Sequence, residues 1–164
     1  MAHEHSYRVA VTWTGRRAPG TTEPRGRIWQ HEVSAAGPGA ILGSADPAFG
    51  GDRLRWNPEQ LLVSALAQCH MMWYLGLCHN AAVVVTAYVD EAVGTLTASG
   101  HGGQFTEVVL HPQVTVAAED MVEAAAALHA DAHRACFIAN SVNFPVRHEP
   151  RIAVADERVG QLFL

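Results

Sequence analysis

The pattern of apolar and polar positions predicts seven main elements along the chain. Two stretches rich in strand-forming residues, Tyr7 to Thr14 and Arg27 to Ser34, predict an opening antiparallel hairpin. Residues 35–56 contain so many Gly and Pro that we expect a long loop without regular structure. Residues 57–80 are apolar on nearly every helical face, which predicts a central helix packed on several sides.

The start of this central helix is marked by Asn57-Pro58-Glu59. Asn is a favourable N-cap, Pro suits the first helical position, and Glu is stabilised at the positive end of the helix dipole. No Asp, Glu, Lys or Arg occurs from Gln60 to Val89, a length that could span a bilayer. Because polar residues interrupt this run and residues 83–89 are rich in β-branched side chains, we expect a buried helix followed by a strand, and no membrane partner.

The second half of the chain predicts a further β pair, a helix and a closing strand. Residues 83–99 and 104–117 predict a second β pair around a turn at 100–103, followed by a helix from Met121 to about Cys136 and a strand from Asn143 to Val154. The order β-β-α-β-β-α-β indicates an α+β fold with antiparallel sheets in one domain, residues 1–164. Its segments are a hairpin at 1–34, a loop at 35–56, the central helix at 57–80, and the remainder at 83–164.

Composition and charge narrow the class of protein. With 49% apolar residues the chain can build a core, and 16 acidic against 11 basic residues argue against a nucleic-acid partner. The first five residues carry neither a basic region nor an apolar segment, so we expect no secretion signal. A cytoplasmic protein is therefore predicted, in which thiols stay reduced unless they take part in chemistry.

The three cysteines are the first candidates for chemistry. Cys69 and Cys78 are nine residues apart, about 13 Å along a helix, and cannot bond while that helix is intact. This spacing favours Cys69 with Cys136 for any internal disulfide. The alternative is that all three are inert, buried side chains, which is the usual state of free cysteines.

Two motifs carry a resemblance to a known family. The first is Asn57-Pro58-Glu59-Gln60-Leu61-Leu62, with Cys69 ten positions after Glu59 and followed by His70-Met71-Met72; the second runs from Cys136 to Val146. With the long loop and the element order, these motifs resemble the OsmC/Ohr family (osmotically inducible protein C / organic hydroperoxide resistance) of thiol peroxidases. The resemblance covers nearly the whole chain and implies antiparallel sheets wrapped around long central helices in an intertwined homodimer.

The resemblance also implies roles for individual residues. Cys69 matches the peroxidatic cysteine, which a hydroperoxide oxidises to a sulfenic acid, and Cys136 matches the resolving cysteine that forms a disulfide with it. Glu59 matches a carboxylate that orients an arginine toward the reacting sulfur. Arg25 is our choice for that arginine because it precedes the second strand, with Arg27 and Arg17 as alternatives.

The spacing of Glu59 and Cys69 bears on how such a site is assembled. Ten residues correspond to roughly 15 Å on one helix, so the carboxylate cannot reach its own thiol. Two copies with antiparallel central helices could combine them, which predicts a homodimer with composite sites. An apolar pocket near the cysteines would suit an organic hydroperoxide, and its candidate lining residues are Phe49, Met71, Met72, Trp73 and Phe137.

The remaining expectations concern partners and rival functions. The resemblance implies a small or lipoyl-type dithiol as electron donor and no bound cofactor. A rival hypothesis is a metal site, since His129, His133 and Cys136 share one helical face and Cys69 or His70 could complete a tetrahedron. The other rival is a small-molecule binding module that keeps the fold without turnover. Cys78 is expected to be a packing residue.

Overall fold

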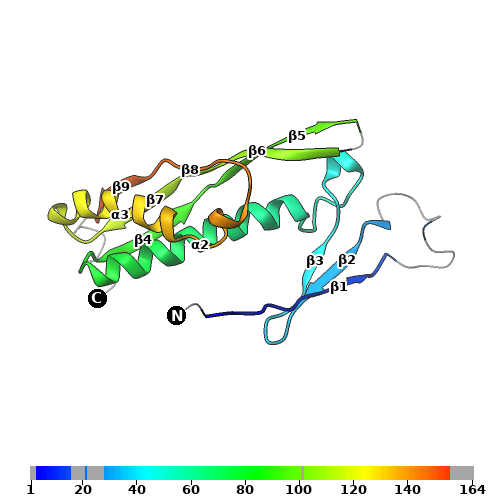
Figure 1. The fold of residues 1–164 in the computed structure, drawn as a ribbon, viewed down its shortest axis with the longest axis horizontal. Coiled ribbons are helices and arrows are strands. Elements are labelled where there is room, and N and C mark those ends of the chain that lie inside the picture. Colours follow the sequence, from blue (N-terminus) through cyan, green and yellow to red (C-terminus); the bar gives the residue numbers. More distant parts are fainter. Residues whose placement is uncertain (1–2, 16–20, 22–27, 101, 156–164) are drawn as a thin grey trace, which may run out of the picture. The chain divides into compact units, whose positions relative to one another are not determined.

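The computed structural model describes residues 3–15, 21, 28–100 and 102–155, and the chain divides into two compact units, residues 1–62 and 63–164 (Figure 1). Helix α2, Pro58–Asn80, contains the boundary between them. The mixed content of helices and sheets confirms the predicted α+β class.

The first unit contains a three-stranded antiparallel sheet in the order β1-β2-β3. The predicted hairpin is confirmed: β1, Ala10–Trp13, pairs with β2, His31–Ser34. The expectation of an irregular segment at 35–56 was wrong, because β3, Ile41–Gly43, adds to β2 and a short 3-10 helix forms at Pro47–Phe49. Although the segment is rich in Gly and Pro, a three-residue strand needs only a free edge to pair with, and β2 offers one.

The start of α2 follows the predicted capping. The side-chain oxygen of Asn57 accepts a hydrogen bond from the backbone N–H of Gln60 at 2.7 Å, and the Gln60 side chain accepts one from the Asn57 backbone N–H at 3.2 Å. This reciprocal arrangement is a capping box, which satisfies two backbone donors at once. The Asn57 amide also donates to Asp46 Oδ2 at 3.0 Å, tying the helix start to the preceding loop.

The second unit has two three-stranded sheets, ordered β4-β7-β9 and β5-β6-β8. We predicted three long strands at 83–99, 104–117 and 143–154. This was wrong in one respect, because each is broken into two strands that belong to different sheets. Neighbours pair antiparallel in β4·β7 and β5·β6, whereas β8 and β9 join in parallel. The strands are β4, Val85–Asp90; β5, Val93–Ser99; β6, Gly102–Leu110; β7, Pro112–Val116; β8, Val146–His148; and β9, Arg151–Val154.

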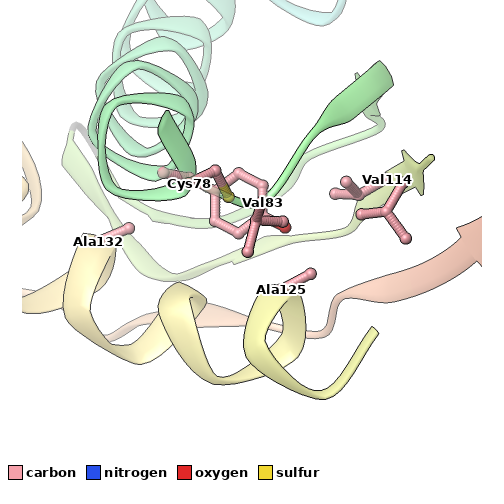
Figure 2. Close-up of a cluster of buried hydrophobic side chains, with 7 residues drawn as sticks. Cys78, Val83, Val114, Ala125 and Ala132 are labelled. Atoms are coloured by element: carbon pink, nitrogen blue, oxygen red, sulfur yellow. The ribbon is translucent and has the colours of Figure 1, made fainter. Parts of the chain in front are cut away.

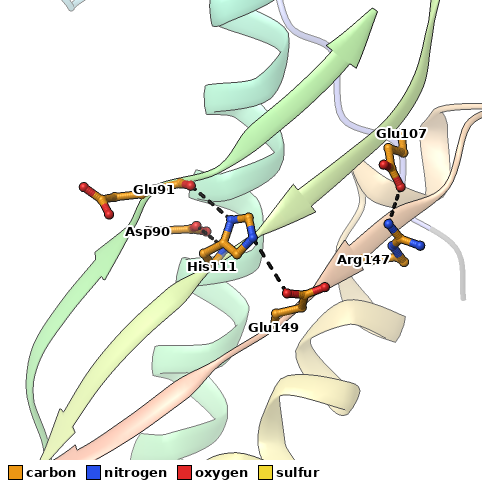
Figure 3. A network of polar contacts seen from close by, with 6 residues as sticks. All are labelled: Asp90, Glu91, Glu107, His111, Arg147 and Glu149. Atoms are coloured by element: carbon orange, nitrogen blue, oxygen red, sulfur yellow. Dashed lines mark hydrogen bonds and ion pairs between the residues drawn. The ribbon is translucent and has the colours of Figure 1, made fainter.

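Polar contacts connect the three points at which these long strands break, between β4 and β5, β6 and β7, and β8 and β9 (Figure 3). Asp90 Oδ1 accepts a hydrogen bond from the His111 backbone N–H at 2.8 Å, and the His111 ring lies 3.2 Å from the Glu91 carbonyl and 3.9 Å from a Glu149 carboxylate oxygen. Arg147 and Glu107 form a further ion pair nearby between β8 and β6. These contacts join residues from three distant segments, which explains why local patterns did not predict the breaks.

Two helices complete the second unit. The predicted second helix is α3, Val122–Ala135, preceded by a 3-10 turn at Glu119–Met121 and followed by another at Ala139–Ser141. One core cluster lies between α2, α3 and the β4-β7-β9 sheet, and Figure 2 shows Cys78, Val83 and Val114 in it. The other core cluster is formed by Leu66 with Val108 and Leu110 of β6.

Much of the apolar surface of α2 is left uncovered by the described part of the chain. By length and composition α2 could cross a membrane, yet in the second unit its residues Leu66, Tyr74 and Cys78 form part of both cores. Only 28% of its most apolar window is buried within the chain. The expectation that a helix apolar all round needs cover from elsewhere is consistent with this low burial.

Candidate active site

The structure brings two of the predicted site residues together. Cys69 lies in the middle of α2 and is 7% exposed, and Cys136 caps the C-terminal end of α3 and is 1% exposed. The Cys136 thiol is placed to donate a hydrogen bond to Cys69, so the two thiols are neighbours. Both cysteines are free thiols here. The packing of α3 on α2 therefore brings together two cysteines that are 67 positions apart in the sequence (136 − 69).

The surroundings of Cys136 suit a thiol that stays protonated. Burial, and then the hydrogen bond to Cys69, raise the pKa of Cys136 to about 11. Two backbone N–H groups act in the opposite direction: Ala139 donates to the sulfur at 3.4 Å, and Ile138 donates as well. A thiol of this kind is a poor first nucleophile, because the thiolate is the reactive form.

Cys78 has different neighbours. It belongs to the apolar core cluster with Val83, Ala125 and Ala132, as Figure 2 shows, and is 1% exposed. Burial raises the pKa of its thiol, although the neighbouring Tyr74 side chain acts to lower it. These contacts place Cys78 among packing residues, as the sequence predicted.

Glu59 lies in the first unit, in the first turn of α2, where the positive end of the helix dipole stabilises a carboxylate. Its Oε2 atom is buried and has no hydrogen-bond partner among the residues that the structure describes. A buried carboxylate oxygen without a partner is costly, so it calls for a cationic or hydrogen-bonding group that is not among them. Glu59 lines a cavity of about 210 Å³ together with Trp29, His31, Asp46 and Phe49, among others.

Which arginine meets this carboxylate stays a prediction. Arg17, Arg25 and Arg27 all lie outside the described residues. Arg55, which sequence reasoning passed over, is in the first unit too, where its Nε atom lies 3.6 Å from Asp52 and its Nη1 atom is buried and unpartnered within the described part of the chain. Its position four residues before Glu59 is the signal that could have singled it out.

The apolar residues expected around the site divide between the two units. Trp73 of α2 packs edge-on against Phe137, with ring centroids 5.4 Å apart. Phe137 is the residue that follows Cys136 in the chain. Met72 and Phe137 are exposed, at 62% and 67%. Phe49 lines the Glu59 cavity in the first unit. The second unit therefore presents an apolar surface next to its cysteine pair.

The histidines of the rival metal hypothesis occupy a different arrangement. His129 and His133 do share one face of α3, and with His70 and His148 they form a group that we call the imidazole cluster. Within the described residues, no three His, Cys, Asp or Glu side chains are placed to hold a metal ion. The sequence analysis did not single out His148. The alternation of half-buried and exposed positions along β8, in which His148 follows exposed Arg147, is the pattern that could have indicated it.

Comparison with known proteins identifies the family. The sequence model of the family described as OsmC-like protein matches residues 50–151, which is more than half of the chain. The chain belongs to the OsmC-like family. The match crosses the boundary between the two compact units and includes both Cys69 and Cys136.

Solved structures agree with this assignment. An OsmC-like protein of unknown function from Vibrio cholerae is 30% identical, with a TM-score of 0.79, over 90% of this chain and 100% of that one. An organic hydroperoxide resistance protein from Elizabethkingia anophelis is 17% identical over 94% and 100%, with a TM-score of 0.66. One from Legionella pneumophila is 17% identical over 93% and 100%, at 0.63. No curated protein matches the chain.

Proposed function

We propose that this protein is a thiol-dependent peroxidase that reduces organic hydroperoxides. The observation that carries the proposal is the contact between the Cys69 and Cys136 thiols, which come from different helices and are both reduced. Membership of the OsmC-like family supports it, as do structural relatives named organic hydroperoxide resistance proteins. Hydrogen peroxide is a second substrate that the same chemistry could accept.

The reaction requires two steps at this cysteine pair. In the first, the Cys69 thiolate attacks the distal oxygen of the hydroperoxide, the O–O bond breaks, and the alcohol leaves after taking up a proton. Cys69 is then a sulfenic acid. In the second step the Cys136 sulfur attacks the Cys69 sulfur, the S–O bond breaks, and water leaves as the disulfide forms. A dithiol, which is itself oxidised to a disulfide, then reduces the enzyme by exchange.

The environment of Cys136 fits the second step better than the first. Its raised pKa keeps it protonated while Cys69 reacts, so its proton is available when hydroxide leaves the sulfenic acid. The backbone N–H groups of Ala139 and Ile138 point at the Cys136 sulfur and would stabilise negative charge on it. The same donors would help Cys136 leave when the reductant attacks the Cys69 sulfur of the disulfide.

Substrate selection would follow from the apolar surroundings. Trp73, Phe137 and Met72 offer an apolar surface beside the cysteine pair. Such a surface favours the hydrocarbon part of a fatty-acid, aromatic or alkyl hydroperoxide over a fully polar peroxide. A lower KM for organic hydroperoxides than for hydrogen peroxide is the kinetic consequence.

We further propose that the active form is a homodimer in which Glu59 of one copy serves Cys69 of the other. The unpartnered Glu59 oxygen and the low burial of α2 support this arrangement. So do the exposed apolar side chains of the first unit, which include Val9, Val11 and Leu54. Glu59 would hold an arginine guanidinium, our choice being Arg25, toward the reacting sulfur.

The first test measures hydroperoxide reduction by the two single-cysteine exchanges. Cys69→Ser is expected to abolish consumption of cumene hydroperoxide in the presence of dihydrolipoamide, because the nucleophile is lost. Cys136→Ser should consume about one equivalent of peroxide per chain and then stall, because a sulfenic acid forms but no disulfide follows. Mass spectrometry of the stalled protein should find the added oxygen on Cys69.

The outcomes distinguish the rival functions. If wild-type protein loses no thiols on addition of peroxide, the peroxidase proposal fails and a binding module on the same fold is left. Stoichiometric zinc in the purified protein, together with unreactive thiols, would instead favour the metal hypothesis. Full multiple turnover by Cys136→Ser would contradict the role given to that residue.

A further inference from the structure

Four histidine rings from three separate elements meet inside the second unit. His70 comes from α2, His129 and His133 from α3, and His148 from β8. The rings of His70 and His129 are stacked, with centroids 5.3 Å apart, and the His148 ring lies 5.5 Å from His70, 6.1 Å from His129 and 5.3 Å from His133. His70 and His129 are fully buried. The imidazole cluster is thus the junction at which α2, α3 and β8 pack together.

The cluster has aromatic and sulfur neighbours, with no carboxylate to balance added charge. Tyr74 of α2 stacks on His129 with a centroid distance of 3.8 Å, and Tyr88 of β4 follows 5.9 Å beyond Tyr74. Cys69 and Cys136 flank the cluster along α2 and α3. Within the described residues, no Asp or Glu forms a hydrogen bond or ion pair with the four rings. Charged side chains on or beside α3 and β8 have other partners: Arg134 pairs with Asp131, Arg147 with Glu107 of β6, and Glu149, which follows His148, lies 3.9 Å from His111.

The hydrogen bonding of the cluster leaves few acceptors for additional N–H groups on its rings. His70 Nε2 and His129 Nδ1 are 3.0 Å apart, so one of them donates and the other accepts. If both rings became charged, two N–H groups would face each other with no acceptor between them. Nδ1 of His70, Nε2 of His129 and Nδ1 of His133 are buried and have no hydrogen-bond partner in the described part of the chain. A charge placed on the fully buried rings of His70 or His129 would therefore be neither solvated nor paired with an acid.

These features set the direction of the pH response. Burial and the neighbouring imidazoles lower the pKa of His70 to about 4 and that of His129 to about 3, and they also lower the pKa of His148. An unfolded or opened chain would bind protons near the ordinary value of 6.5. Because the open form binds protons at a higher pH than the closed form, falling pH favours opening, beginning near pH 6.5 and continuing to the folded-state values of about 4 and about 3.

The cluster is connected to the cysteine pair through the backbone. His70 follows Cys69 directly in α2, and the Cys136 backbone N–H donates to the His133 carbonyl at 3.3 Å. Any movement of α3 away from α2 must therefore move Cys136 relative to Cys69. We propose that the imidazole cluster is a pH-sensitive switch, in which proton uptake releases α3 and β8 from α2 and separates the two cysteines.

The experiment measures opening without any use of peroxidase activity. Hydrogen exchange of the reduced, metal-free protein is followed by mass spectrometry from pH 7.5 to 4.5, with rates corrected for the chemical effect of pH. Protection of α3 and of residues 136–148 is expected to fall, by on the order of tenfold per pH unit for each proton taken up on opening. Thermal unfolding should show the melting temperature decreasing over the same range.

Matched variants separate the cluster from general acid effects. His129→Gln keeps hydrogen-bonding groups but cannot be protonated in this range, so its loss of protection should be shallower than that of wild type. His148→Gln serves as a second variant, since it is only half-buried and its replacement disturbs the core less. His79→Gln, at an exposed position of α2, should follow wild type.

Two results would overturn the inference. One is protection of α3 that stays unchanged down to pH 4.5 in wild type, and the other is an identical pH dependence in His129→Gln, His148→Gln and wild type. The inference depends on the proposed function only for its consequence at the cysteine pair. If the protein proves inactive toward peroxides, the exchange experiment still decides whether the cluster opens with acid.

Discussion

At the scale of single residues, three cysteines of one chain occupy two kinds of environment. Cys69 and Cys136 contact each other across the α2–α3 junction, whereas Cys78 is enclosed by apolar side chains. All three are buried, so burial alone does not separate a reactive cysteine from an inert one. What separates them is the neighbour: a second thiol in one case, and Tyr74 with aliphatic side chains in the other.

Replacing Cys78 should therefore affect stability and not catalysis. Cys78→Ser puts a more polar hydroxyl among Val83, Ala125 and Ala132 and is expected to lower the free energy of unfolding by about 1–3 kcal/mol. Urea denaturation checks the loss, and the peroxidase rate of the folded protein should stay within twofold, roughly, of wild type. Cys78→Ala is the matched control, since it removes the sulfur without adding a polar group. A folded but inactive Cys78→Ser protein would contradict the packing role.

At the scale of elements, α2 illustrates how a short sequence sets a boundary. Asn57 and Gln60 cap the helix reciprocally, and Asp46 is bound to the same Asn57 side chain. The strands of the second unit behave differently, since their ends are determined by contacts among His111, Asp90 and Glu149 from three segments. Helix ends were accordingly predicted within a few residues, and strand ends were not.

The helix cap makes a stability prediction at this scale. Asn57→Ala removes both the cap and the hydrogen bond to Asp46, and should cost about 1–2 kcal/mol of unfolding free energy. Asn57→Ser keeps a capping oxygen but loses the amide that reaches Asp46, so its cost should be smaller. Thermal or urea unfolding of both variants measures the difference. Equal losses in the two variants would mean that the Asp46 contact, and not the cap, stabilises this helix start.

At the scale of the whole molecule, the proposed dimer accounts for surfaces that one chain leaves uncovered. Most of the apolar window of α2 is unburied within the chain, and the apolar residues of the β1-β2-β3 sheet are exposed as well. A homodimer with composite sites would cover such surfaces and supply Glu59 to Cys69 of the partner. Oligomeric state and catalysis are then linked, and one experiment can test both.

Two inactive variants should restore activity when combined. Glu59→Ala and Cys69→Ser are unfolded together in equal amounts and refolded, so that half of the dimers are mixed. Each mixed dimer has one site with both defects and one intact site, so activity should recover to about a quarter of wild type (one half times one half). Each variant refolded alone is the control. If no peroxidase activity returns in a mixture shown to contain mixed dimers, Glu59 and Cys69 do not act across chains.

Much of the candidate site could be predicted from the sequence because its signals are local. The Asn57-Pro58-Glu59 start, the apolar run that follows it, and the motifs around Cys69 and Cys136 each lie within about a dozen residues. Caps and side-chain periodicity act over such distances, so they survive without knowledge of the fold. The choice among Arg17, Arg25 and Arg27 had no such signal and stays a prediction.

The sequence by itself determined the α+β class and the central helix with its start, and its motifs singled out Cys69 and Cys136 as the candidate pair. Only the tertiary structure decided where the long strands break, which histidines meet, and that His148 joins His70 and His129. The physical reason is the range of the interactions involved. Caps and periodic patterns depend on neighbours along the chain, whereas strand breaks and the imidazole cluster depend on segments that become neighbours only after folding.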